Sequence, residues 1–388
     1  MTTTKNILFS ISIPKILVYE FTTVIGFNAI RPHGGRMEIG PAMGSTEKRV
    51  PQALSFAETA VYRRSAGTVE ICWPADSEPP VAVYVRNRQQ GWEVAAGPER
   101  ISKDSLTISG RDLSLRPFFK IVAGDGSCVI AAERRMPLEG AVNFRDIGGY
   151  QTTGGRLVRW GRVFRSDGLY RLTDADLAVL SRLEIRHVFD FRTASEAANA
   201  PNRLPEAPPV AYHNLPVSHG KFDFVQAVKR LKAGDTSWLT PDFMMNGYLG
   251  SLSLHGETWG RVIRHIAGAS DGATVFHCTG GKDRTGACAA LLLLALGVPE
   301  ETVIADHQLS NHYIAELLPK INQMLAAYGV DPDILLPYLT APRECIITFL
   351  DALNARYGSA ATYLQEKGGL FPETLEQLRE TLLEPECP

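Results

Sequence analysis

The sequence predicts an α/β fold in which helices flank a central sheet, preceded by an all-β sandwich. Three patterns predict it: apolar residues alternate with period two over about 53–136, helical patterns dominate after about 137, and one short apolar strand leads through a glycine-rich loop into a buried helix. The 388 residues are enough for two or three domains. We expect a segment at 1–48, the sandwich domain at 49–136 and the α/β domain at 137–388.

The N-terminal 48 residues do not read as part of either domain. Residues 7–13 are apolar, but Lys15 and Glu20 interrupt the run, which is too short and too broken for a membrane span. We expect this segment to be disordered or extraneous to the folded protein. Oligomeric state is not indicated by any pattern.

Composition is that of an ordinary globular protein, with 45% hydrophobic residues, 21% charged residues and a formal net charge of −2. This balance gives no bulk-charge argument for a nucleic-acid partner. The six cysteines, at positions 72, 128, 278, 288, 345 and 387, show no paired spacing. We therefore expect no disulfide framework and a cytoplasmic protein, with secretion as the alternative.

Five short segments between 53 and 136 alternate apolar and polar residues. They are 68–73, 81–88, 105–109, 117–122 and 128–132, and turn residues separate them. Short alternating strands at such spacing are typical of a sandwich of the fibronectin or immunoglobulin type. This part of the sequence contains no catalytic constellation.

The most informative stretch of the chain is 273–297. Residues 273–276 predict a short buried strand, and 286–296 predict a buried helix that ends at Gly297. The loop between them would direct backbone N–H groups and the positive end of the helix dipole into one concavity. Such a concavity suits an anion.

Two side chains in this loop indicate covalent chemistry. Cys278 is placed so that its sulfur would face the anion, where the loop amides, the helix end and Arg284 favour the nucleophilic thiolate. Arg284 follows six positions later, and its planar fork can hold two oxygens of a phosphoryl group. His277 can brace the loop backbone, and Thr285 can donate its hydroxyl to the sulfur.

The pattern His-Cys, two residues, Gly, two residues, Arg-Thr-Gly at 277–286 resembles the phosphate-binding loop of cysteine-dependent protein tyrosine phosphatases. With Lys282 and Asp283 before the arginine, it is similar to the bacterial tyrosine/dual-specificity branch, whose loop also resembles that of phosphoinositide phosphatases. The resemblance covers about 139–370 and implies a tyrosine phosphatase-like central sheet. The residues expected to bind phosphate are Thr279, Gly280, Gly281, Lys282 and Thr285.

Further stretches resemble the same branch: 143–150, 161–167, 189–193 and 306–311. In the last of these, the family pattern usually has an aromatic residue where this chain has His307. Asp146, Asp190 and Arg192 are candidates for acid or loop support, and the alternative is that they form a structural salt-bridge set bracing the phosphate loop.

The mechanism expected from the loop is in-line attack of the Cys278 thiolate on phosphorus, with Arg284 and the amides holding the equatorial oxygens. No metal or cofactor is needed, because these groups supply the positive potential. The acid that protonates the leaving oxygen is Asp283 or Asp242, with Asp190 third. We favour Asp283 because the sequence alone fixes its place beside the anion, whereas Asp242 falls within 222–248, an expected lid.

These features predict a protein-tyrosine phosphatase, with dual specificity as an extension. The alternatives are a phosphoinositide phosphatase of the same mechanism and a non-catalytic module that binds phosphorylated residues. The expected partners are phosphorylated proteins or phosphoinositides, with no nucleic acid and no membrane span. Lys282 would face a second phosphate or the leaving group, and the alternative is a solvated loop charge.

Overall fold

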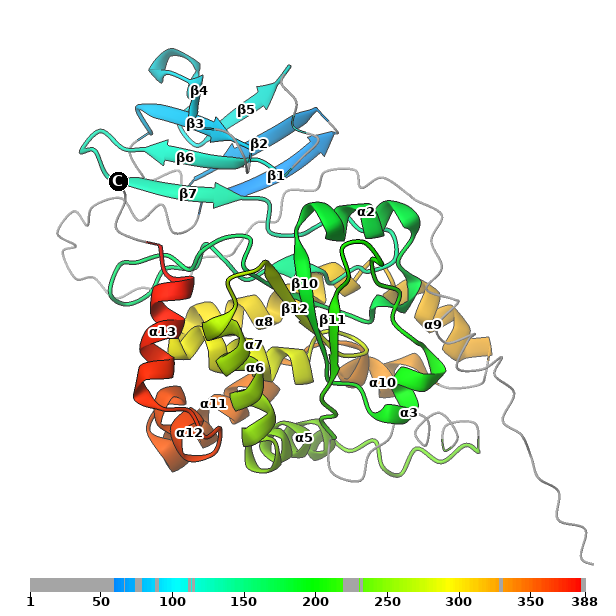
Figure 1. The fold of residues 1–388 in the computed structure, drawn as a ribbon. Coiled ribbons are helices and arrows are strands. Elements are labelled where there is room, and N and C mark those ends of the chain that lie inside the picture. Colours follow the sequence, from blue (N-terminus) through cyan, green and yellow to red (C-terminus); the bar gives the residue numbers. More distant parts are fainter. Residues whose placement is uncertain are drawn as a thin grey trace, which may run out of the picture.

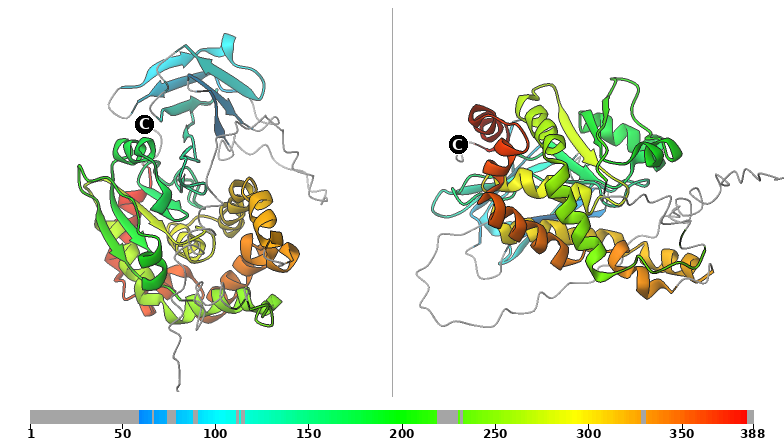
Figure 2. Two further views of the ribbon diagram at one scale, coloured as in Figure 1. Left: turned by 90° about the vertical axis from the view of Figure 1, so that its right-hand side faces the viewer. Right: turned by 90° about the horizontal axis from the view of Figure 1, so that it is seen from below.

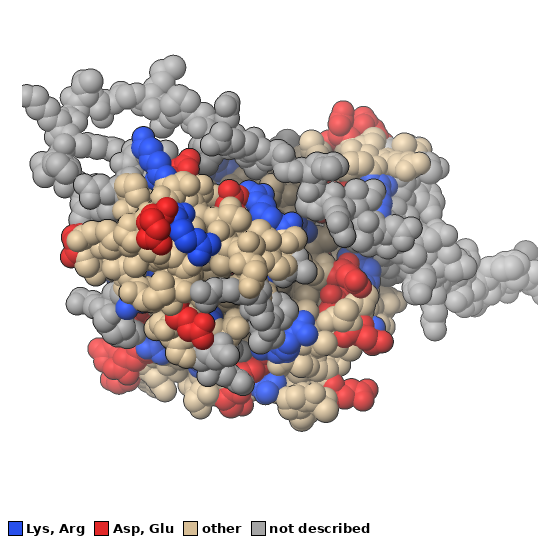
Figure 3. Space-filling view, turned by 90° about the horizontal axis from the view of Figure 1, so that it is seen from above, with Lys and Arg blue, Asp and Glu red and all other residues tan. Residues whose placement is uncertain are grey.

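The computed structural model describes residues 59–384, apart from 66, 74–78, 88–90, 111–112, 114–115, 219–229, 231–232 and 328–330. The segment 1–48 and the first part of the expected lid, at 222–229, lie outside the described residues. A β-rich part sits at one end of a larger α/β part (Figures 1 and 2). Acidic and basic side chains are interspersed over the described part of the face seen from above (Figure 3).

The β-rich part consists of two antiparallel sheets. One has the order β1 (Ala60–Ser65), β2 (Thr68–Cys72), β5 (Ser105–Ser109), and the other has the order β4 (Glu93–Ala96), β3 (Ala82–Arg86), β6 (Phe118–Val122), β7 (Cys128–Ala132). Inward-facing residues of both sheets, such as Val69 and Phe119, share one core. The predicted sandwich is therefore confirmed.

The α/β part is built on a five-stranded sheet. Its order is β11 (Ala211–Asn214), β10 (Ile185–Asp190), β12 (Ala273–His277), β9 (Val163–Ser166), β8 (Arg145–Asp146). The first four strands are parallel, and β8 is antiparallel to β9. All five residues of β12 are buried, as expected for a central parallel strand covered on both faces. Asp190 pairs with His277, so β10 and β12 end side by side.

Helices cover both faces of this sheet, which confirms the predicted α/β class (Figure 1). They are α2 (Asp174–Arg182), α3 (Ala194–Asn199), α5 (Pro241–Leu254), α6 (Gly256–Gly268), α7 (Arg284–Ala295), α8 (Glu300–Ile314), α9 (Leu318–Ala327), α10 (Pro332–Leu339), α11 (Arg343–Tyr357), α12 (Ala360–Glu366) and α13 (Pro372–Leu382). In the described part of the chain, none combines the length and apolar character that crossing a membrane requires.

Helix α7 carries the functional loop on its N-terminus and is buried along nearly its whole length. Helix α5 packs beside it, with Tyr248 and Leu252 fully inside the same core. The expectation of a lid over 222–248 is therefore wrong for the part that α5 occupies, because its apolar residues are needed to fill the core.

Several polar contacts join the sandwich to the α/β part, and two of them involve side chains deep in the junction. Arg116 Nη1 donates to Asp146 Oδ2 at 2.7 Å, and Trp160 Nε1 donates to the Ile130 carbonyl at 2.8 Å. Asp146 also accepts the backbone N–H of Gly161 at 2.6 Å. The structure thus places Asp146 at the junction of the two parts, where it anchors Arg116, and not beside the phosphate loop.

The described cysteines differ in oxidation state. Cys72, Cys278, Cys288 and Cys345 are free thiols, whereas Cys128 is disulfide-bonded. One bridged cysteine is not a disulfide framework, but it does not fit the reducing compartment that the sequence suggested. Absence of paired spacing in the sequence does not exclude a bridge between residues far apart in the chain.

Candidate active site

Cys278 lies at the carboxyl end of β12, where the chain turns away from the sheet into the loop. Its side chain is only 3% exposed, and the backbone N–H of Gly281 donates to its sulfur at 3.3 Å. The loop closes at Arg284, the first residue of α7. The strand, loop and helix therefore follow the predicted order, with the sulfur directed into the loop.

His277 braces this loop as a neutral imidazole. Its Nδ1 lies 3.1 Å from the Cys278 carbonyl, and its Nε2 lies 3.0 Å from Asn202 Nδ2. Asn202 is oriented by Arg192, which donates to its Oδ1 at 2.8 Å, so Nε2 of His277 accepts and Nδ1 carries the proton. Burial lowers the pKa of His277 to about 4. The ring can therefore hold the Cys278 carbonyl without carrying a charge.

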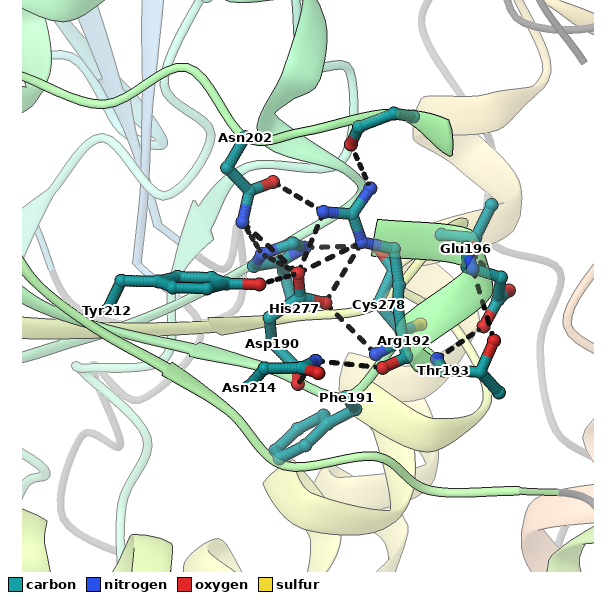
Figure 4. Close-up of polar contacts among 12 residues, drawn as sticks. Asp190, Phe191, Arg192, Thr193, Glu196, Asn202, Tyr212, Asn214, His277 and Cys278 are labelled. Atoms are coloured by element: carbon teal, nitrogen blue, oxygen red, sulfur yellow. Dashed lines mark hydrogen bonds and ion pairs between the residues drawn. The ribbon is translucent and has the colours of Figure 1, made fainter. Parts of the chain in front are cut away.

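Asp190 and Arg192 form a closed network behind His277 (Figure 4). Arg192 Nη2 donates to Asp190 Oδ2 at 2.7 Å, and the Tyr212 hydroxyl donates to the same oxygen at 2.9 Å. Burial opposes ionisation of Asp190, but His277 and Arg192 together lower its pKa to about 2. A carboxylate this firmly ionised and hydrogen-bonded favours the structural alternative over a role as the acid.

Arg284 is held by a residue that sequence reasoning missed. Its Nη1 and Nη2 donate to the two carboxylate oxygens of Glu196 at 2.7 and 2.9 Å, and the Thr279 hydroxyl donates to Glu196 at 2.8 Å. Burial would raise the pKa of Glu196, but the bonds and charge of Arg284 lower it to about 2. The sequence did contain a signal that could have drawn attention to Glu196, because Thr193 and Glu196 form a Thr-x-x-Glu capping box that starts α3.

The loop carbonyls are fixed from outside the concavity. Asn143 Nδ2 donates to the Gly280 carbonyl at 3.0 Å, and Arg165 Nη2 donates to the Gly281 carbonyl at 2.9 Å. Arg165 is itself paired with the buried Asp306 at 2.5 Å. Gly281 has a φ of 68°, which favours glycine. With these carbonyls bonded elsewhere, the loop amides are the groups left to face an anion.

Lys282 and Asp283 form a buried pair. Lys282 Nζ lies 2.7 Å from Asp283 Oδ2, and the lysine side chain is only 7% exposed. The alternative of a solvated loop charge at Lys282 is therefore wrong. On the other side of the carboxylate, the Tyr248 hydroxyl donates to Asp283 Oδ1 at 3.0 Å. Asp283 is thus held beside the loop by groups from two elements.

Two other candidate residues, Asp242 and Thr285, do not make the contacts with the loop that a role in catalysis would require. Asp242 lies in the first turn of α5 and is exposed, and no hydrogen bond within the described part of the chain joins it to the loop. The Thr285 hydroxyl is buried, but among the described residues it reaches no partner, so the expected bond to the Cys278 sulfur is not formed. No group of three or more His, Cys, Asp or Glu side chains among those residues could hold a metal ion.

The sequence of this chain is similar to those of known bacterial proteins. A protein provisionally named a tyrosine-protein phosphatase from Cupriavidus necator is 32% identical over 224 residues, covering 58% of this chain and 80% of the relative. The triple specificity protein phosphatase PtpB of Mycobacterium tuberculosis is 30% identical over 292 residues, covering 65% of this chain and 99% of the relative.

A crystal structure of P. aeruginosa TpbA matches with 17% identity and a TM-score of 0.24 over 58% of this chain and 88% of that one, which adds nothing to the fold assignment. The family model described as "Tyrosine phosphatase family" matches residues 136–384. This match takes in the central sheet, the loop at 278–283 and the helices that support it. The chain therefore belongs to the tyrosine phosphatase family.

Proposed function

We propose that this protein hydrolyses phosphotyrosine and related phosphomonoesters through a cysteinyl-phosphate intermediate formed on Cys278. The observation that carries the proposal is the loop itself: a buried cysteine sulfur at one end and a carboxylate-oriented Arg284 at the other, with the carbonyls bonded on the outside. The same observation weighs against a non-catalytic binding module, which would not need the nucleophile.

The reaction has two steps. The Cys278 thiolate attacks phosphorus, the S–P bond forms, and the P–O bond to the leaving group breaks. Arg284 and the loop amides hold the equatorial oxygens and stabilise their charge in the transition state. Water then attacks the cysteinyl-phosphate, releasing phosphate and the thiolate. An acid must protonate the leaving oxygen, and its conjugate base can then activate the water.

We assign the acid to Asp283. It lies next to Arg284 and is held at the loop by Tyr248 and Lys282, whereas Asp242 is exposed on α5 and Asp190 is enclosed in the network of Arg192 and Tyr212. Geometry is the first requirement for a general acid, and among these three candidates it favours Asp283.

The substrate range is proposed to extend beyond phosphotyrosine. Lys282 is buried at the loop, where its ammonium group can turn from Asp283 to a second phosphate of a phosphoinositide or to the leaving group. The printed name of the M. tuberculosis relative, a triple specificity protein phosphatase, supports a wide range. Comparing hydrolysis of phosphotyrosine, phosphoserine and phosphoinositide substrates by wild type and Lys282→Met would test this extension, which fails if the ratios are unchanged.

Residues 49–136 and 137–388 are proposed to be separate domains. The sandwich and the central sheet have separate hydrophobic cores, and polar contacts such as Arg116–Asp146 join them. Residues 49–136 produced alone should give a β-rich circular dichroism spectrum with a cooperative unfolding transition. An unfolded fragment would contradict the assignment.

The disulfide at Cys128 bears on the compartment. The cytoplasmic expectation relied on the lack of disulfides, which persist mainly in oxidising compartments, so we now favour the secreted alternative. Alkylation of the protein in its native cells should leave Cys128 unmodified. A freely alkylated Cys128 would instead support a cytoplasmic location.

The test is single turnover of p-nitrophenyl phosphate without added metal. Wild type should release p-nitrophenol, and Cys278→Ser should release none. With phenyl phosphate, whose poorer leaving group needs the acid, Asp283→Asn should be slowed, while Asp242→Asn serves as the matched control and should resemble wild type. Full activity of Cys278→Ser would overturn the mechanism. Loss of activity in Asp242→Asn, with none lost in Asp283→Asn, would identify Asp242 on α5 as the acid.

A further inference from the structure

A chain of hydrogen bonds extends from Asp283 into the core. The Tyr248 hydroxyl, on α5, lies 3.0 Å from Asp283 Oδ1 and 2.7 Å from Nε2 of His307, on α8. Both Tyr248 and His307 are 1% exposed. The mechanism above uses neither residue, although each is a buried titratable group in direct line with the proposed acid.

The direction of this chain can be assigned from its far end. The backbone of Ala341 fixes the Asn311 amide, because its N–H donates to Oδ1 at 2.6 Å and its carbonyl accepts from Nδ2 at 3.0 Å. Asn311 Nδ2 donates to Gln308 Oε1 at 3.1 Å, which leaves Gln308 Nε2 facing His307 Nδ1, also at 3.1 Å. Nδ1 of His307 therefore accepts, and Nε2 carries the proton.

The Tyr248 oxygen then accepts from His307, so its own proton is directed to Asp283 Oδ1. Burial, aided by the charge of Arg165, lowers the pKa of His307 to about 3, and burial raises the pKa of Tyr248. Both side chains therefore stay neutral, and the hydrogen bonds keep their direction from His307 through Tyr248 to Asp283. Asp283 Oδ1 is held permanently as an acceptor.

We propose that Tyr248 and His307 are positioning residues that confine the transferable proton of Asp283 to Oδ2, an inference that rests on Asp283 being the acid. Lys282 Nζ lies 2.7 Å from Oδ2, so this oxygen takes up the proton when the ammonium group turns to the bound substrate. In the first step, that proton passes from Oδ2 to the leaving oxygen as the P–O bond breaks. In the second step, the carboxylate recovers a proton from the attacking water. Tyr248 and His307 change protonation in neither step.

The packing around His307 is fitted to this role. A Cβ atom on Gly286, in the first turn of α7, would lie 2.9 Å from His307 Cδ2, so only glycine lets the ring approach this closely. A phenyl ring at position 307 would fill the space but could not donate to Tyr248.

The test compares leaving groups of different basicity, because a poor leaving group needs the acid and a good one does not. Tyr248→Phe is expected to lower kcat/KM on phenyl phosphate about tenfold, and on p-nitrophenyl phosphate by about twofold or less. His307→Phe should show the same selectivity in weaker form, and His307→Gln, which retains a donor, should restore the wild-type ratio. Tyr363→Phe is the matched control, because this buried hydroxyl donates to the Leu252 carbonyl at 2.7 Å away from the loop.

Asp283→Asn, measured on the same two substrates, separates the inference from the proposed function. If Asp283→Asn loses phenyl phosphate hydrolysis selectively and Tyr248→Phe loses both activities equally, or loses neither, the positioning role is overturned while the acid assignment stands. If Asp283→Asn itself shows no selectivity in an active enzyme, the acid assignment fails and the inference fails with it. Urea unfolding of each variant excludes a general loss of structure as the cause of a uniform decrease.

Discussion

Glu196 binds the Arg284 guanidinium through both carboxylate oxygens, with Nη1–Oε2 at 2.7 Å and Nη2–Oε1 at 2.9 Å. The pair is almost fully buried. It links α3, which follows β10, to the first residue of α7, and so sets the direction in which Arg284 enters the loop. The arginine that would bind phosphate is thus oriented before any substrate arrives.

Removing this carboxylate should affect both folding and activity. Glu196→Ala leaves a buried guanidinium without its partner and is expected to lower the free energy of unfolding by about 3 kcal/mol. The kcat/KM for p-nitrophenyl phosphate should fall as well, because Arg284 loses its orientation. Urea denaturation and steady-state kinetics measure the two effects. Glu376→Ala, at an exposed position of α13, should change neither, and equal behaviour of the two variants would refute the prediction.

The buried His277 should make stability depend on pH. Its pKa is about 4 in the folded protein against an ordinary value of 6.5, so the unfolded state binds more protons between these values. Stability is therefore present above pH 6.5 and decreases as the pH falls toward 4, by up to about 3 kcal/mol from this residue. Asp190, with a pKa of about 2, does not titrate in this range.

Urea midpoints measured from pH 7 to pH 4.5 check this dependence. His277→Gln should make the decrease shallower and leave the part that the buried His307 contributes, whereas His312→Gln, at an exposed position of α8, should preserve the full decrease. A decrease of the same slope in His277→Gln and wild type would show that another group is responsible.

Alanine substitutions at the two neighbouring loop glycines, Gly280 and Gly281, should differ sharply in their effect on stability. A Cβ at Gly281, whose φ is 68°, would lie 2.5 Å from backbone atoms of Ser166 and Asp167, whereas a Cβ at Gly280 meets only the Lys282 side chain, at 3.7 Å. Gly281→Ala is expected to cost about 1–3 kcal/mol in stability and to weaken inhibition by inorganic phosphate. Gly280→Ala should fold like wild type, and a larger loss there than at Gly281 would contradict this loop geometry.

Gly286→Ala offers an independent perturbation of His307. The added methyl group would meet His307 Cδ2 at 2.9 Å and displace the ring from Tyr248. We expect a decrease in kcat/KM that is larger for phenyl phosphate than for p-nitrophenyl phosphate, as for Tyr248→Phe. Combining Gly286→Ala with Tyr248→Phe should add little to that selectivity, and fully additive effects would indicate that the two residues act separately.

Local patterns in the sequence were sufficient for the elements that carry the site. The strand ending near Phe276 and the buried helix that follows the loop are both confirmed, because each depends on residues close together in the chain. The strands β1 and β4 were missed. In β1 the adjacent Arg63 and Arg64 break the apolar alternation, and β4 has only four residues.

The supports of the site were harder to predict because they depend on tertiary placement. Tyr248 has the appearance of an ordinary core aromatic in the sequence, and only the packing of α5 against α7 directs its hydroxyl to Asp283. Asp146 was grouped with the loop because it lies in a family-like stretch, yet its neighbour Arg145 reaches Asp306 while Asp146 itself contacts Arg116. Successive residues of a strand point to opposite sides, which separates these two roles.

The most direct test of the account is to trap the intermediate. Asp283→Asn enzyme mixed with p-nitrophenyl phosphate, quenched rapidly in acid and digested, should yield a peptide with a phosphoryl group on Cys278, detected by mass spectrometry. Cys278→Ser treated in the same way should yield none. Phosphate release at the normal rate by Cys278→Ser, with no phosphoryl group on any wild-type peptide, would contradict nucleophilic catalysis by this cysteine.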